Sequence, residues 1–236
     1  MVARFRGLYT QDCLDVLDEW GGMPGIPDQK NLRRGRIQVL NNTFLEKYFA
    51  TAHPIFPTWA ILASGICIYF AAVHRPMNNV AMVGLYLAGF FSWSLIEYIA
   101  HRWIMHPLGK LTPDRKLRIF LLHGYHHEFP QDTYRLVAPV ALVLPFLFIL
   151  TLIAYSVFGG EIWYIYMGGL FLGYLAYDWM HYYTHHFHPK RGFGKFMVKN
   201  HAIHHYVNPT MNYGLSSPFW DYVFGTATTM KKEKPS

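Results

Sequence analysis

Charged residues and cysteines are scarce in this chain of 236 residues. Charged side chains make up only 15% of it, whereas 52% of the residues are hydrophobic and 18% are aromatic, a balance that favours a membrane protein of about one domain. Two cysteines, Cys13 and Cys67, are too few for a disulfide framework, so we expect thiols in a reducing compartment. Aspartates such as Asp12 and Asp15 interrupt the first residues, and no secretory signal peptide is expected there.

Four apolar stretches approach the 20 or so residues that span a bilayer. They cover residues 55–73, 80–100, 136–158 and 162–179. The fourth contains three glycines and is the one that most resembles a buried soluble helix. The pattern predicts an all-α integral membrane protein, with four transmembrane helices in two hairpins and a cytosolic helical cap. We expect hairpin turns near residues 75–79 and 159–161.

The basic residues predict the orientation of these helices. Every lysine and arginine except Arg75 lies before the first stretch, between the second and third, or after the fourth. The positive-inside rule then places both termini and the middle loop in the cytosol. We attribute the net charge of +7 to the membrane topology and to contact with anionic lipid headgroups, and we expect no nucleic-acid partner. The expected organisation is a cytosolic segment 1–54 with an interfacial helix near 44–50, a membrane domain 55–230 and a basic tail 231–236.

Ten of the fourteen histidines fall into four tight clusters beside the apolar stretches. These are His101 with His106; His123 and His126 with His127; His181 with His185; and His201 and His204 with His205. Neutral imidazole is the commonest protein ligand for metals such as iron and zinc. Ten exceed the four to six ligands of one ion, so the clusters predict two metal ions. Four crossings would bring all four clusters to the cytosolic side. The remaining histidines, His53, His74, His186 and His188, fall outside the pattern, and we assign them to interface or loop roles. Among these four, His186 is the strongest candidate for an additional ligand.

Spacing within the clusters favours helices. His181 and His185 are four residues apart and share a helical face, as do the pairs that end at His127 and His205. We expect the middle histidine of each H-x-x-H-H motif to join its own set. Five residues separate His101 from His106, which on a regular helix would splay them unless the helix ends or bends before Pro107. The clusters recur at intervals of 78 to 80 residues, which suggests two halves that each supply five ligands.

Two carboxylates lie beside the histidines. Glu97 precedes His101 by four residues, and Asp178 precedes His181 by three. Metal-bound histidines commonly donate their second ring N–H to a carboxylate, and we expect that role for both. The alternative is ordinary snorkelling or helix-dipole placement. Tyr182 is an aromatic candidate for the wall of a substrate slot or for a membrane-interface belt. We take Asp178, Glu97 and Tyr182 as candidate catalytic residues.

Several longer motifs accompany the histidines. They are Glu97-Tyr98-x2-His101-Arg102, His123-Gly124-x-His126-His127, Arg135-Leu136-Val137-x-Pro139, Tyr177-Asp178-x2-His181-Tyr182, Ser216-Ser217-x2-Trp220-Asp221 and Phe224-Gly225-Thr226. Over residues 40–228 the chain resembles the fatty acid 2-hydroxylases of the fatty acid hydroxylase and sterol desaturase superfamily. The resemblance implies that the ten clustered histidines hold two metal ions, with iron expected for activity. Isolated protein could carry zinc instead, because zinc binds a given nitrogen site more tightly than Fe(II). It also implies that O2 and two electrons hydroxylate the 2-position of a long acyl chain in a fatty acid, ceramide or dihydroceramide.

The resemblance leaves the electron donor and the compartment to be inferred. Some family members carry a cytochrome b5 domain, and none fits in residues 1–54, so we expect a separate donor such as cytochrome b5 with its reductase or a ferredoxin. The sequence Lys232 to Ser236 resembles a dilysine retrieval tail, which favours the endoplasmic reticulum; a bacterial inner membrane is the alternative. Rival functions are a sterol desaturase, a carotenoid hydroxylase, or a membrane metal-binding or transport protein. Transporters usually hold ligands near mid-membrane, whereas these histidines follow the spans.

Overall fold

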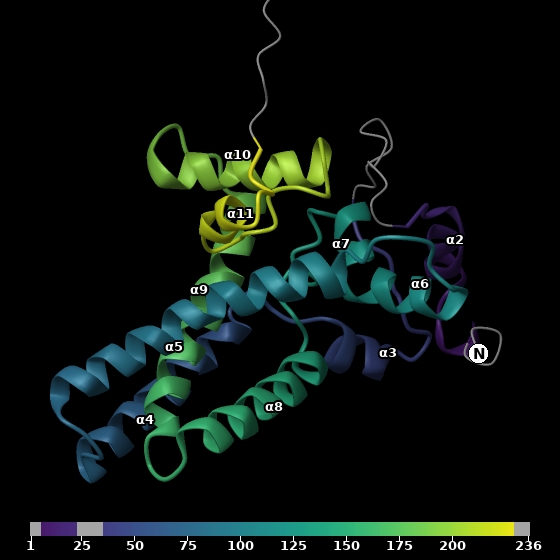
Figure 1. Ribbon diagram of the computed structural model, residues 1–236. Helices are drawn as coiled ribbons and strands as arrows, with labels where there is room; N and C mark the ends of the chain where they lie inside the picture. Colours follow the sequence, from purple (N-terminus) through teal and green to yellow (C-terminus); the bar gives the residue numbers. More distant parts are fainter. Residues whose placement is uncertain (1–5, 23–34, 229–236) are drawn as a thin grey trace, which may run out of the picture. The chain divides into compact units, whose positions relative to one another are not determined.

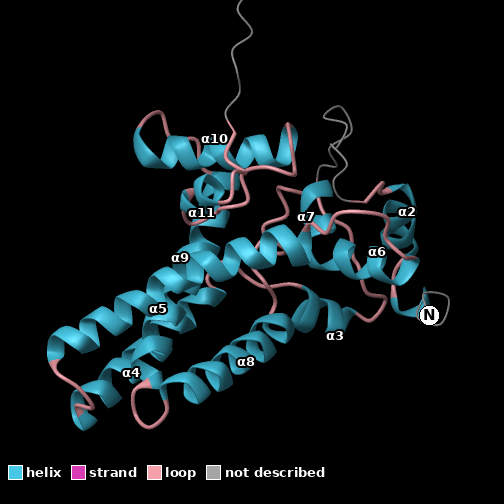
Figure 2. Ribbon diagram, in the orientation of Figure 1, coloured by secondary structure: helices cyan, strands magenta, loops and turns pink. Residues whose placement is uncertain are grey.

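The computed structural model describes residues 6–22 and 35–228, which form helices and loops without a strand (Figures 1 and 2). They divide into two compact units that alternate along the chain. We call Val39–Ile96 with Thr133–Tyr182 the membrane unit. The remainder, Met1–Gln38, Glu97–Asp132 and Tyr183–Ser236, is the histidine unit. The predicted basic tail, residues 231–236, lies outside the described residues.

Long helices dominate the membrane unit: α4 (Trp59–His74), α5 (Asn79–Ile99), α8 (Val140–Phe158) and α9 (Trp163–His186) (Figure 1). Three helical segments are long and apolar enough to cross a bilayer: Phe56–His74, Asn79–Met105 and Ala141–Phe158. They correspond to the first three predicted spans. The third starts later than expected, because Pro139 lies in extended backbone just before the helix. The hairpin turns after His74 and Phe158 are confirmed.

Helix α9 is less apolar than the other three long helices, because the neighbouring helices cover it. Its residues Met167, Leu170 and Tyr174 are buried in the core of the unit, whereas the large side chains of α4 and α8 are mostly exposed. Two of its glycines touch the backbone of α5. A Cβ on Gly169 would lie 1.8 Å from a carbonyl oxygen of α5, and one on Gly173 would lie 2.6 Å from another. The three glycines thus serve close helix packing, which accounts for their place in this helix.

Shorter helices precede α4. Residues 43–50 form α3 (Thr43–Leu45) and the π turn η2 (Glu46–Ala50), and η3 (Phe56–Thr58) follows. Asn42 caps α3 by accepting the N–H groups of Phe44 and Leu45, each at 3.0 Å. The predicted helix near residues 44–50 is therefore confirmed, and Phe44, Tyr48 and Phe49 on it are exposed.

The histidine unit contains η1 (Arg6–Leu8), α2 (Gln11–Glu19), η4 (Ala100–Met105), α6 (Pro113–Ile119), η5 (Phe120–Gly124), α7 (Tyr125–Glu128), α10 (Gly192–Tyr206) and α11 (Phe219–Val223). One face of α2 is buried, and it includes Cys13, Leu14 and Leu17. The next residue after α2, Trp20, packs so closely on Gly124 that a Cβ there would lie 2.6 Å from its ring. Both cysteines of the chain are buried thiols.

Candidate metal centre

A π-helical turn brings the first histidine pair together. Residues Ala100–Met105 form η4, and the N–H of His106 donates to the carbonyl of His101 at 3.0 Å, an i to i+5 bond. This wider turn aligns residues five apart, so the ring centroids of His101 and His106 lie 4.8 Å from each other. Such π turns are rare in proteins as a whole, and those that occur are often found at functional sites. The expected bend before Pro107 is therefore a widened turn as well as a helix end.

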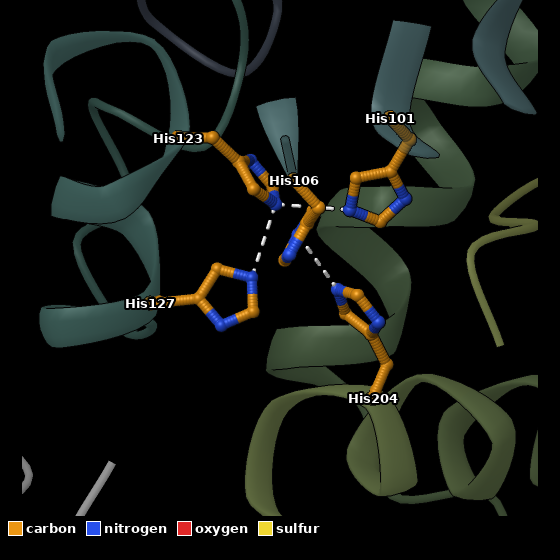
Figure 3. Close-up of side chains that lie close together, drawn as sticks. All are labelled: His101, His106, His123, His127 and His204. Carbon is orange, nitrogen blue, oxygen red and sulfur yellow. Dashed lines mark hydrogen bonds between the residues drawn. The ribbon is translucent and has the colours of Figure 1, made fainter. Parts of the chain in front are cut away.

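Five buried histidines of the histidine unit form a first group (Figure 3): His101, His106, His123, His127 and His204. The Nε2 atom of His123 lies 2.9 Å from that of His101 and 3.0 Å from that of His127. The Nε2 atoms of His106 and His204 are 3.1 Å apart. Nitrogens held about 2.1 Å from one ion at right angles would be separated by about 3 Å, so these distances fit a shared metal ion.

A second group in the same unit contains His126, His185, His201 and His205, whose ligand nitrogens lie within 4.8 Å of one another. The Nε2 atoms of His185 and His201 are 2.8 Å apart. His181 lies one helical turn before His185 on α9 and is also buried. The rings of His127 and His205 stack with centroids 4.1 Å apart, so the two groups are neighbours.

The middle histidines of the two H-x-x-H-H motifs are exchanged between the groups. His126 belongs to the second group although His123 and His127 belong to the first, and His204 belongs to the first although His201 and His205 belong to the second. Our expectation that each middle histidine joins its own set is therefore wrong. Adjacent helical residues point about 100° apart. His126 is accordingly turned away from the group that His127 joins.

Backbone carbonyls set the protonation of two rings in the first group. The carbonyl oxygen of Tyr213 lies 2.6 Å from Nδ1 of His101, and that of Met211 lies 2.8 Å from Nδ1 of His204. A carbonyl only accepts, so both rings donate from Nδ1 and turn an Nε2 lone pair toward the group. Both ring nitrogens of His205 are buried and have no hydrogen-bond partner in the described part of the chain. Convergent lone pairs and an unpaired buried imidazole fit cation binding.

Burial keeps these imidazoles neutral, as metal ligation requires. It lowers the pKa of His106, His127 and His205 well below the ordinary value, and the neighbouring histidines of each group add to the shift. The pKa of His204 is lowered in the same way, chiefly by burial. Burial together with the adjacent His186 lowers the pKa of His185 to about 3. At neutral pH the site therefore presents uncharged nitrogen donors.

One of the two carboxylates, Glu97, is placed differently from expectation. Glu97 does not accept from His101, whose Nδ1 is bound to Tyr213 instead. Its Oε1 accepts from the backbone of Leu215 and Ser216, at 3.2 and 2.8 Å. The expected direct contact between Glu97 and His101 is therefore wrong. Asp178 is buried and precedes His181 by three residues on α9, and its role remains a prediction, as does that of the partly buried Tyr182.

The histidines outside the clusters lie outside both groups in the described residues. His74 pairs with Glu161 at the exposed end of α4, with 3.1 Å between Nδ1 and Oε1. His53 accepts the N–H of Ile55 on its Nδ1 at 3.2 Å. Sequence reasoning missed the carbonyls of Met211 and Tyr213. It quoted Asp221 within a motif but gave it no role, whereas the structure shows that Asp221 accepts the backbone N–H of Tyr213.

With this geometry established, a family model described as fatty acid hydroxylase matches residues 86–226. The chain belongs to the fatty acid hydroxylase family. The matched range contains both histidine groups, the carbonyls of Met211 and Tyr213, and Glu97, Asp178 and Asp221. The recognised likeness to this superfamily is therefore confirmed.

Curated relatives of this chain bear names that specify lipids. A ceramide very long chain fatty acid hydroxylase of Saccharomyces cerevisiae is 36% identical over 203 residues, covering 82% of this chain and 50% of that protein. A dihydroceramide fatty acyl 2-hydroxylase of Arabidopsis thaliana is 38% identical and covers 63% of each. The fatty acid 2-hydroxylase of Homo sapiens is 38% identical, covering 69% of this chain and 43% of that protein. The chain thus spans between 43% and 63% of their lengths.

A solved structure is also similar. It is described as full-length scs7p with only the hydroxylase domain visible, and it matches with a TM-score of 0.73 and 31% sequence identity. The match covers 83% of this chain and 74% of that one. The helical architecture is therefore that of the visible hydroxylase domain.

Proposed function

We propose that this protein is a membrane-bound, O2-dependent hydroxylase that places a hydroxyl group on the 2-position of a long fatty acyl chain. The observation that carries the proposal is the pair of buried histidine groups that meet at His127 and His205. Neighbouring ions suit the activation of O2, and the relatives' names supply the substrate class: a fatty acid, a ceramide or a dihydroceramide. Sterol desaturation and carotenoid hydroxylation are outcomes of the test below.

The first group would hold one ion, and His126, His185, His201 and His205 would hold the other with His181 as fifth ligand. His181 precedes His185 at the start of its cluster, as His101 precedes His106 at the start of the first cluster. Iron supplies the redox chemistry that oxidises an unactivated C–H bond, whereas zinc has none and would give an inactive protein. The residues contribute neutral donors, fixed tautomers and exclusion of water, because every one of these histidines is buried.

The location follows from the helices and the charges. We propose that α9 crosses the membrane together with α4, α5 and α8, and that the histidines face the cytosol, where the basic segments would lie. The membrane would be the endoplasmic reticulum or a bacterial inner membrane. Electrons would come from a separate donor, such as cytochrome b5 with its reductase or a ferredoxin. An acyl chain already in the bilayer would then reach the site without leaving it.

Two side chains beside His181 on α9 have proposed roles. Asp178 would orient His181 by accepting a ring N–H, and Tyr182 would line the path of the acyl chain. Removal of a carboxylate that orients a metal ligand typically costs roughly 10- to 100-fold in metal affinity or activity. Asp178→Asn should therefore lower metal content at limiting metal, while Tyr182→Phe should leave metal content unchanged and alter the products.

The activity is tested by lipid mass spectrometry in a host that lacks a 2-hydroxylase. Expression of the wild type should produce 2-hydroxy acyl lipids, and His204→Ala should abolish them. His74→Ala is the matched control, because His74 lies outside both groups and pairs with Glu161 at the surface. If sterol or carotenoid products change while acyl chains stay unhydroxylated, the substrate assignment is wrong.

A further inference from the structure

The chain segment from Met211 to Ser216 runs beside the first histidine group. Its carbonyls at Met211 and Tyr213 bind Nδ1 of His204 and His101. It includes Asn212, which has a left-handed backbone with φ of 56°. The tautomers of two ligands therefore depend on where this segment's backbone lies. What holds the segment is then as important as the carbonyls themselves.

Two buried carboxylates hold four consecutive backbone N–H groups of the segment. Asp221 is 0% exposed, and its Oδ1 and Oδ2 accept the N–H groups of Tyr213 and Gly214, both at 2.8 Å. Glu97 is 4% exposed, and its Oε1 accepts those of Leu215 and Ser216. Each of these four N–H groups therefore has a buried side-chain acceptor. The N–H of Gly214 points away from the carbonyl of Tyr213 in the same trans peptide, so Asp221 holds the peptide that carries this carbonyl.

Further contacts fit Asp221 and the segment to their surroundings. Thr226 donates its hydroxyl to Oδ1 of Asp221 at 2.8 Å, and that hydroxyl also lies 2.8 Å from the hydroxyl of Tyr98. Glycine is required at position 214, where a Cβ would lie 2.2 Å from the carbonyl oxygen of Ser217 and 2.9 Å from Asp221. Buried polar groups with this many partners occupy one arrangement. The position of the Tyr213 carbonyl is therefore closely defined.

We propose that Asp221 and Glu97 are positioning residues for the first metal ion, acting through the Met211–Ser216 backbone to fix the Nδ1–H tautomers of His101 and His204. The inference rests on the proposed metal centre and adds residues that touch no ligand histidine. It also gives a role to the Ser216-to-Asp221 motif, whose aspartate serves the metal site. Loss of such support should lower affinity for the first ion by roughly 10- to 100-fold and leave the second ion bound.

Substitutions separate this role from general stability. Asp221→Asn keeps one carbonyl oxygen where two accept, so one backbone N–H would face an amide N–H. Glu97→Gln, by contrast, should be tolerated, because a single oxygen of Glu97 accepts all its bonds and its Oε2 has no hydrogen-bond partner in the described residues. Glu97→Ala removes that oxygen. His74→Ala is the control, because His74 lies outside both groups and pairs with Glu161 at the surface.

The measurement is metal content per purified full-length chain at limiting free zinc, with helicity by circular dichroism. Wild type, Glu97→Gln and His74→Ala should bind about two ions; Asp221→Asn and Glu97→Ala should bind about one. Retention of one ion in Asp221→Asn would show that the chain still folds. Two ions in Asp221→Asn, loss of both ions, or a Glu97→Gln protein that behaves like Glu97→Ala would overturn the inference. A wild type that binds fewer than two ions would instead refute the metal centre itself.

Discussion

Arg135 belongs to a motif that resembles the 2-hydroxylases, yet the structure gives it a role in folding. Within the membrane unit its guanidinium forms an ion pair with Glu46 and donates to the carbonyl of Ala50 at 3.0 Å. Glu46 in turn accepts the N–H groups of Val39 and Leu40, at 3.2 and 3.0 Å. Arg135 thus ties the helix before the first span to the chain that leads into α8. We predict that Arg135→Met lowers stability and leaves the position of hydroxylation unchanged.

The magnitude follows from burial. The side chains of Arg135 and Glu46 are only 10% and 15% exposed, so solvent screens their interaction weakly. Removal of one partner of a buried pair costs about 3 to 5 kcal/mol, because the other charge is left uncompensated. At about 2 to 4 °C per kcal/mol for a protein of this size, the lower figure corresponds to a fall in Tm of about 6 to 12 °C.

Thermal unfolding in detergent, followed by tryptophan fluorescence, measures this change. Arg118→Met is the matched control, because Arg118 is exposed and should shift Tm by less than about 2 °C. In the double variant Arg135→Met/Glu46→Gln, the loss should be smaller than the sum of the single losses, since no bare carboxylate remains. A wild-type Tm for Arg135→Met, strictly additive losses, or a hydroxyl at a new position would refute the structural role.

Two further predictions concern helix packing and ligand exchange. Gly169→Ala should destabilise the protein by about 1 to 3 kcal/mol or more, because its Cβ would lie 1.8 Å from a backbone oxygen of α5; Gly84→Ala, with nothing within 4 Å of the added Cβ, should leave Tm unchanged. Metal counting should find about one ion in the His204→Ala/His101→Ala double variant and none in His204→Ala/His201→Ala, because only the first pair shares a group. The same count in both double variants would contradict the exchange.

The grouping of the histidines was largely predictable from sequence because much of their geometry is local. Residues four apart share a helical face wherever a helix forms, so the spacing alone predicts that His123 and His127 lie together. The π turn at η4 was not predictable, because an i to i+5 bond leaves no periodicity in only six residues. The sequence indicated that the helix must change near Pro107, and the structure shows that it widens.

The exchange of His126 and His204 depends on information beyond the motif. The H-x-x-H-H pattern predicts that the middle histidine points away from the histidine that follows it. The middle histidine can join a group only if other histidines lie on the side toward which it points. Two motifs related by about 78 residues provide such a neighbour for each other. The stacked rings of His127 and His205 lie where the two groups meet.

The carboxylates show why helical spacing alone misassigned a partner. Spacing placed Glu97 on the face of His101 and suggested a direct bond, but a buried carboxylate binds whichever donors are nearest, and here these are the backbone N–H groups at 215 and 216. The acceptor for His101 is a carbonyl, which every residue carries and no sequence pattern marks. In the sequence only Asp221 and Gly214 point to this carbonyl. Asp221 supplies an acceptor for the backbone, and Gly214 lacks a Cβ and so allows the backbone to approach closely. Support for a metal ligand is therefore best sought among the residues that hold its carbonyl partner.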